Sequence, residues 1–315
     1  MNQGTTHRHV FGPVPSRRLG RSLGIDLTPA KTCSLNCRYC QLSATEHPTS
    51  VRREFIPGKV ILAELKARLA EIEPPDWITF SGTGEPTLHS GLGEIIRGIR
   101  ALTTTPICVI TNGTLLGRQD VRADLMPADR VMPTLCSTDA AVFQQVHRPA
   151  PELGLSGILS GLQRFAAEYR GYLEIEVFIL PGINDRPAEV AALGRYLRGL
   201  ARLTGVYLNT AVRPPVDGSL RPATPEEIEI FRGHLGAELP ISTVYDHSPV
   251  PLRQASRREV GASEILALLE RHPCDLEQLT SVLGATGAEL EAKLNELAHD
   301  GRVERTTDGT WKLPQ

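Results

Sequence analysis

The 315-residue sequence lacks several features that would each place it in a broad class of protein. It has no apolar run near the ~20 residues of a membrane-spanning helix, and residues 1–10 contain no apolar signal core. Its formal net charge is only −2, so no global attraction to nucleic acid or to a membrane surface is expected. Only six cysteines are present, and they do not suggest a paired disulfide framework. We therefore expect a soluble, cytoplasmic protein.

Three of the six cysteines lie within eight residues, at Cys33, Cys37 and Cys40. Three thiols at spacings of four and three residues can converge on one metal centre. Because four thiolates saturate a cubane iron–sulfur cluster, three leave one iron open to a substrate or cofactor. The alternatives are a zinc site short of its fourth ligand, with only His47 nearby, or buried thiols packed as small hydrophobes. Such crowding is improbable by chance, so the cluster is the preferred interpretation.

Strand and helix patterns alternate through the body of the chain. Strands are predicted at 24–27, 76–81, 107–111, 130–136, 173–180 and 206–209, and helices at 58–72, 92–102, 119–125, 154–168, 187–200 and 225–235. This alternation predicts βαβ units around a parallel sheet, with function at the carboxyl ends of the strands. Residues 11–23 are predicted to be a loop rich in Gly, Pro and Arg. Its Arg17, Arg18 and Arg21 form either a solvated basic loop or an anion site.

Polar turns follow three of the predicted strands. After 76–81, Gly82 and Gly84 allow close approach of a ligand, and Glu85 offers a carboxylate to an ammonium group. After 107–111, the Asn112-Gly113 pair is also typical of a simple left-handed turn. The strand 130–136 ends in Cys136 and is followed by Ser137 and Asp139, of which Asp139 is either a ligand or the N-cap of a helical turn at 140–145.

The cysteine spacing, followed one strand later by the glycine turn, resembles the radical S-adenosylmethionine (SAM) superfamily. The resemblance implies a partial (β/α)6 barrel, a [4Fe–4S] cluster on the three cysteines, and SAM chelated by the open iron. It also implies reductive cleavage of SAM to a 5′-deoxyadenosyl radical and an electron donor such as flavodoxin or ferredoxin. The residues expected at SAM are Tyr39 near the adenine, Gly82, Gly84 and Glu85 at the methionine amino group, and Ser137 and Asp139 at the ribose. Cys136 is either a hydrogen-atom donor or a buried inert thiol.

The stretch Val14–Asp26 resembles one branch of the superfamily, related to wyosine-type tRNA-modifying enzymes. Modification of a tRNA base is therefore an alternative function. Against it, no cysteine precedes Cys33 to hold a second cluster, and Cys108 and Cys274 are isolated and expected to be structural. Residues 1–260 carry 29 Lys and Arg against 26 Asp and Glu, which is a weak basic footprint. An alternative from another class is a cluster-based redox regulator.

The pattern changes near residue 261, so we expect a barrel over 1–250, a linker over 251–260 and a second domain over 261–315. Helices are predicted at 263–271, 275–283 and 286–299, with a two-stranded ribbon at 302–304 and 310–313. Three helices and a ribbon are typical of a winged-helix domain, which often reads DNA. This one holds five Lys and Arg against ten Asp and Glu, so contact with protein is favoured over DNA.

Overall fold

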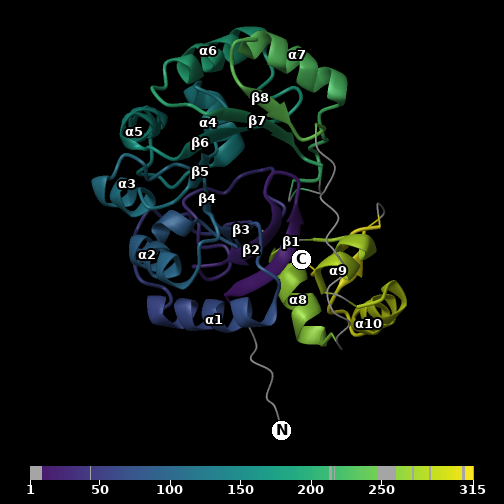
Figure 1. Ribbon diagram of the computed structural model, residues 1–315. Coiled ribbons are helices and arrows are strands. Elements are labelled where there is room, and N and C mark those ends of the chain that lie inside the picture. The colour runs from purple at the N-terminus through teal and green to yellow at the C-terminus, as the bar shows by residue number, and fades with distance from the viewer. Residues whose placement is uncertain are drawn as a thin grey trace.

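The computed structural model describes residues 9–42, 44–212, 215, 217–246, 260–271, 273–283, 285–306 and 309–314. Its main body is a curved eight-stranded sheet in the order β1 to β8, with helices around the outside (Figure 1). The strands are β1 (Val10–Ser16), β2 (Gly20–Ile25), β3 (Trp77–Phe80), β4 (Ile107–Thr111), β5 (Arg130–Pro133), β6 (Tyr172–Ile179), β7 (Gly205–Thr210) and β8 (Ile241–Thr243). Strands β2 to β8 run parallel, and β1 pairs antiparallel with β2.

The helices of the body follow the predicted pattern closely. They are α1 (Gly58–Glu71), α2 (Leu92–Leu102), α3 (Gln119–Leu125), α4 (Ala140–His147), α5 (Leu155–Glu168), α6 (Pro187–Arg198) and α7 (Pro225–Leu235), with a 3₁₀ turn η1 at Pro86–Leu88. The α/β fold and its parallel sheet are therefore confirmed. Matched boundaries such as those of α2 reflect strong apolar periodicity at 3.6 residues per turn.

The prediction of six strands was wrong, because the sheet has one further strand at each edge. Residues 10–25 form the β1–β2 hairpin, where the sequence predicted a loop up to residue 23. The glycines, prolines and arginines of this segment concealed the strand, and its register shifts between Phe11 and Val14. Strand β8 has only three residues, too few to show an alternating pattern.

Alternation along each strand separates two environments. On β6, Ile175 and Val177 point into the large core between the sheet and its helices. Glu174, Glu176 and Phe178 therefore point to the concave inner side of the sheet.

The C-terminal residues form a second, smaller core. They fold as α8 (Ala262–Arg271), α9 (Leu276–Leu283), α10 (Gly287–His299) and a ribbon of β9 (Glu304–Arg305) and β10 (Trp311–Lys312). This unit lies beside β1 (Figure 1), where Val14 packs against its core. Thr286 and Glu289 make a reciprocal capping box at the start of α10. Except for Val260, the predicted linker 251–260 lies outside the described residues.

Among the described residues, no helix is both long and apolar enough to cross a membrane.

Candidate functional site

The three clustered cysteines lie on a loop that follows β2 and is tied to distant parts of the chain. The Asn36 and Arg38 N–H groups donate to the carbonyls of His147 and Val146, at 2.9 and 3.0 Å. The Cys33 carbonyl accepts from the Thr49 N–H at 2.9 Å. The end of α4 therefore fixes the middle of the cysteine loop, near the carboxyl ends of the strands.

Each of the three cysteine sulfurs has a nitrogen neighbour. The Lys31 ammonium donates to Cys40 Sγ at 3.2 Å, and the Asn112 amide donates to Cys33 Sγ at 3.5 Å. Nδ1 of His147 lies 3.1 Å from Cys37 Sγ. Burial, reinforced by the charge of Glu85, raises the pKa of the Cys33 thiol to about 11. Nitrogen donors of this kind stabilise thiolates, which are the form that binds metal.

Lys31 was not predicted to belong to the site. It is one of two described non-glycine residues with positive φ, at 59°. Its N–H donates to the Thr83 carbonyl at 2.9 Å, so its backbone joins the cysteine loop to the glycine turn after β3. The sequence gives no sign of this positive φ, because lysine is not a residue type that favours the left-handed region.

The glycine turn after β3 packs tightly against the start of the cysteine loop. A Cβ on Gly84 would lie 2.2 Å from the Thr32 carbonyl oxygen, and one on Gly82 would lie 2.2 Å from the Asp26 carboxyl carbon. Only glycine fits at these two positions. Thr83 between them donates to Asp26 through its N–H at 3.0 Å and its hydroxyl at 2.9 Å. The residue separating the glycines thus anchors the turn to the end of β2.

Glu85 is buried, and four donors inside the protein hold its carboxylate. One oxygen accepts from the Thr87 N–H and hydroxyl at 3.0 and 2.6 Å and from the Thr111 hydroxyl at 2.6 Å. The other oxygen accepts from the Asn112 N–H at 2.7 Å. Burial raises the pKa of Glu85, and these hydrogen bonds oppose the rise. The carboxylate thereby links the turn after β3 to the turn after β4.

The turn after β4 is the left-handed turn that the sequence predicted, and it also contacts the cysteine loop. Gly113 has φ 73°, as a left-handed turn requires. The Asn112 amide also donates to the Ser34 hydroxyl at 2.9 Å, and its oxygen accepts from the Thr114 N–H at 3.0 Å. Asn112 therefore supports the cysteine loop directly.

Tyr39, expected near an adenine, faces the inner side of the sheet. Its ring stacks on Phe178 of β6 with centroids 4.0 Å apart and meets the His147 ring edge-on at 5.7 Å. Cys136 Sγ lies 4.0 Å from the Tyr39 hydroxyl within a small apolar cluster. Burial raises the pKa of Cys136 to about 12, so this thiol stays protonated at neutral pH.

Ser137 and Asp139 are hydrogen-bonded to their own loop. The Asp139 side chain caps α4 by accepting from the Ala141 and Val142 N–H groups at 2.8 and 3.0 Å. Ser137 is buried, and its hydroxyl accepts from the Asp139 N–H at 2.9 Å. Contact of either residue with ribose stays a prediction.

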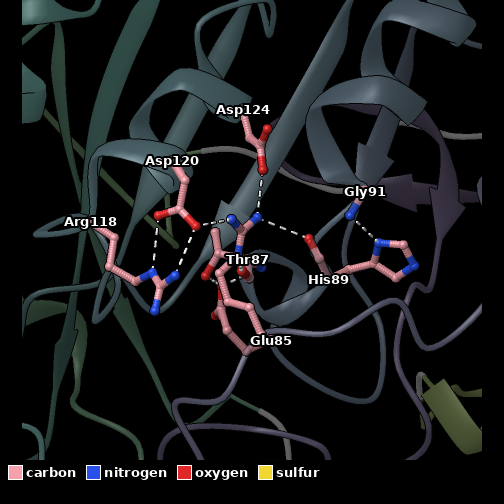
Figure 2. Close-up of polar contacts among 8 residues, drawn as sticks. Glu85, Thr87, His89, Gly91, Arg118, Asp120 and Asp124 are labelled. Atoms are coloured by element: carbon pink, nitrogen blue, oxygen red, sulfur yellow. Dashed lines mark hydrogen bonds and ion pairs between the residues drawn. The ribbon is translucent and has the colours of Figure 1, made fainter.

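A buried arginine, Arg52, clamps the segment after the cysteine loop. It donates to the Thr87 and His89 carbonyls at 2.8 and 3.0 Å and pairs with Asp120 and Asp124 at 2.8 and 2.5 Å. Figure 2 shows these two aspartates beside the turn that carries Glu85 and Thr87. The clamp thus joins α3, η1 and residues 50–54 behind Glu85.

Comparison with known proteins identifies the family. A model described as the radical SAM superfamily matches residues 27–193, more than half of the chain. This chain belongs to the radical SAM superfamily.

A UPF0026 protein of Methanocaldococcus jannaschii is 32% identical to this radical SAM chain over 304 residues, 93% of this chain and 94% of that protein. A Brachyspira hyodysenteriae protein named GTPase Obg is 32% identical over 300 residues, 94% of this chain but only 43% of that protein. The chain thus spans less than half of the latter relative. A solved radical SAM methyltransferase from Sphaerobacter thermophilus matches with a TM-score of 0.48 and 18% identity, over 70% of this chain and 65% of that chain.

The cofactors of the superfamily, and so of this chain, are a [4Fe–4S] cluster and SAM. The donor set fits the cluster, since three thiols on one loop each have their own nitrogen neighbour. Among the described residues, no three His, Cys, Asp or Glu side chains converge on a point suited to a single metal ion.

Proposed function

We propose that this protein cleaves SAM reductively and uses the resulting 5′-deoxyadenosyl radical to abstract a hydrogen atom from a substrate on the inner side of the sheet. The observation that carries the proposal is the arrangement of Cys33, Cys37 and Cys40. Their sulfurs lie on one loop, each beside a side-chain nitrogen, next to a turn that only glycine fits. Bound there, the cluster would supply one electron to SAM, taken from a donor such as flavodoxin or ferredoxin.

The chain's own residues would bind and orient the reactants. Cys33, Cys37 and Cys40 would hold three irons, and the Gly82–Glu85 turn would receive the methionine amino group of SAM. The close packing of this turn against Thr32 supports that role, because it holds the turn directly beside the cysteine loop. Tyr39 would lie near the adenine, while its stack on Phe178 limits water on the inner side of the loop.

The C-terminal unit is proposed to be a winged-helix domain that contacts protein. Its three helices and ribbon support the assignment. Its excess of acidic residues, ten against five basic ones, opposes the binding of nucleic-acid phosphates.

The experiment compares cysteine variants reconstituted anaerobically. In the parent protein we expect about four irons per chain and formation of 5′-deoxyadenosine from SAM after reduction with dithionite. Cys33→Ala should lose both, because a ligand is missing. Cys108→Ser and Cys274→Ser are matched controls at buried cysteines away from the loop, and both should retain iron and product.

Normal 5′-deoxyadenosine formation by Cys33→Ala would contradict the proposal. Loss of iron in either serine control would show that the ligand set is wrong.

A further inference from the structure

Arg18 and Arg21 of the β1–β2 hairpin point to opposite sides of the sheet. The Arg21 guanidinium is directed outward to the Glu73 and Pro74 carbonyls, at 3.5 and 3.4 Å. Arg18 instead pairs with Glu176 at 3.1 Å, and its guanidinium lies 4.3 Å from the centre of the Tyr207 ring. From the sequence, this segment was either a solvated basic loop or an anion site. In the structure it places one arginine, Arg18, on the inner side of the sheet.

This arginine lies close below the cysteine loop. Glu176 and Phe178 point to the same side of β6, and two residues of a strand span about 7 Å. Phe178 stacks directly on Tyr39 of the cysteine loop. The Arg18–Glu176 pair therefore lies one layer of side chains further from the cysteine loop than Phe178, on which Tyr39 stacks.

The two members of the Arg18–Glu176 pair differ in how many of their polar atoms have hydrogen-bond partners. The Glu176 carboxylate accepts from Asn209 and Thr134, both at 3.1 Å, in addition to Arg18. Nη1 of Arg18 is buried and has no hydrogen-bond partner among the described residues. A buried N–H without a partner is unfavourable, and more so when the group is charged. An acceptor at Nη1 would remove that cost.

The charge around Nη1 favours an anionic acceptor. Burial raises the pKa of Tyr207, and the positive charges of both Arg18 and Arg17 oppose this rise, so both arginines lie near the ring. The opposing carboxylates are those of Glu176 and Glu174, and Glu174 is already paired with Arg130 at 2.7 Å. One positive charge is in excess.

We propose that Arg18 binds an anionic group of the substrate, a carboxylate or a phosphate, through Nη1, and that Glu176 positions the guanidinium. This inference rests on the proposed function, because it places the substrate between the cysteine loop and the β1–β2 turn. Arg18 acts as a binding residue and Glu176 as a positioning residue. A substrate anchored there by its anion would present its other end to the cysteine loop.

The experiment uses the full, anaerobically reconstituted protein with two probes, sodium phosphate and sodium acetate, in isothermal titration calorimetry. We expect one probe to bind once per chain in the millimolar range. Arg18→Gln should weaken that binding at least ~10-fold. The matched control is Arg21→Gln, which removes a neighbouring arginine directed outward and should bind the probe normally. The preferred probe tells whether the substrate anion is a phosphate or a carboxylate.

Glu176→Gln separates binding from a purely structural ion pair. The amide still accepts from Arg18 but no longer neutralises it, so probe affinity should rise several-fold. A structural pair predicts lower stability and no gain in binding. The double variant Arg18→Gln/Glu176→Gln leaves no buried charge unpaired, so it should fold yet fail to bind the probe.

Absence of probe binding in the parent protein, or binding unchanged in Arg18→Gln, would overturn the inference. The proposed function would be unaffected by that result, since it is tested separately by 5′-deoxyadenosine formation without any probe.

Discussion

At the scale of single residues, Glu85 is hydrogen-bonded inside the protein and is also expected to contact SAM. Its carboxylate is enclosed by donors from Thr87, Thr111 and Asn112, and it lies in the turn expected to hold the SAM amino group. A carboxylate has about four acceptor sites, and bonds to a charged acceptor are stronger than neutral ones. Because these internal donors join two turns through its carboxylate, Glu85 has a structural role that does not depend on SAM binding.

Glu85→Gln is therefore expected to have two effects. The lost charge should lower the free energy of unfolding by about 1.5–3 kcal/mol, because charge-assisted bonds to buried donors become neutral. It should also weaken SAM binding roughly ten-fold. Urea unfolding and a SAM titration followed by electron paramagnetic resonance measure the two effects. Glu94→Gln, on the exposed face of α2, is the control. Reduced stability with normal SAM binding would mean that Glu85 is structural only.

His147 lies beside Cys37 Sγ, and this contact is expected to affect the reduction potential of the cluster. Burial lowers the pKa of its imidazole to about 4, so the ring is neutral at pH 7. A neutral ring protonated at Nδ1 would donate a hydrogen bond to Cys37 Sγ, 3.1 Å away. Hydrogen bonds to cluster sulfurs stabilise the reduced, more negative state and raise the reduction potential.

Replacement of His147 by leucine should lower the cluster's reduction potential by about 40 mV, the one-electron equivalent of a hydrogen bond of about 1 kcal/mol. The measurement is a redox titration of the cluster in the absence of SAM. His234→Leu changes an exposed histidine of α7 and should leave the potential as it is. An unchanged potential in the His147 variant would show that the ring only packs against the cysteine loop.

At the scale of elements, the site depends on turns that hold one another. The cysteine loop is bonded to the end of α4, the glycine turn to the end of β2, and Arg52 to α3 and η1 (Figure 2). The Arg52 side chain is only 6% exposed, whereas that of Arg118, which shares Asp120 with it, is 51% exposed. These two arginines form a matched pair for testing the clamp.

We expect Arg52→Met to lower the free energy of unfolding by about 3–5 kcal/mol, because Asp124 loses its partner and the Thr87 and His89 carbonyls lose their donor, while Asp120 keeps Arg118. Iron content after reconstitution should also fall, since η1 supports Glu85. Arg118→Met breaks an exposed pair and should cost less than ~1 kcal/mol. Urea unfolding and iron analysis give both quantities. Equal losses in the two variants would contradict a specific role for the Arg52 clamp.

At the scale of the whole molecule, two hydrophobic cores meet at β1. The large core lies between the sheet and its helices, and the second belongs to the C-terminal unit. Val14 of β1 packs against that second core, so the hairpin that delivers Arg18 inward also supports the C-terminal unit. Cys274 is fully buried in this unit and is bonded through its backbone to Trp311.

The charge of the C-terminal unit predicts its choice of partner. Helix α10 exposes Glu291 and Glu296, with Lys293 as its one basic residue before His299. We expect no measurable binding of the full chain to a 20-base-pair DNA duplex at physiological salt, by fluorescence anisotropy. Sequence-independent binding that weakens steeply as salt rises would contradict this prediction.

The sequence by itself determined the local features. It predicted the cysteine loop, the glycine turn and α1 to α7 within a few residues, because each depends on spacing or residue type within one segment. It also predicted that the strand ends carry the site, since parallel strands end at one edge.

Tertiary structure alone decided which side chains meet. Cys37 and His147 are 110 positions apart, and Arg18 and Glu176 lie on opposite halves of the sheet, so neither pair has a local pattern. Strand β1 pairs despite a composition typical of a loop, because β2 offered it an edge to bond. Long-range pairing is set by the closing of the sheet and by burial, which periodicity does not report.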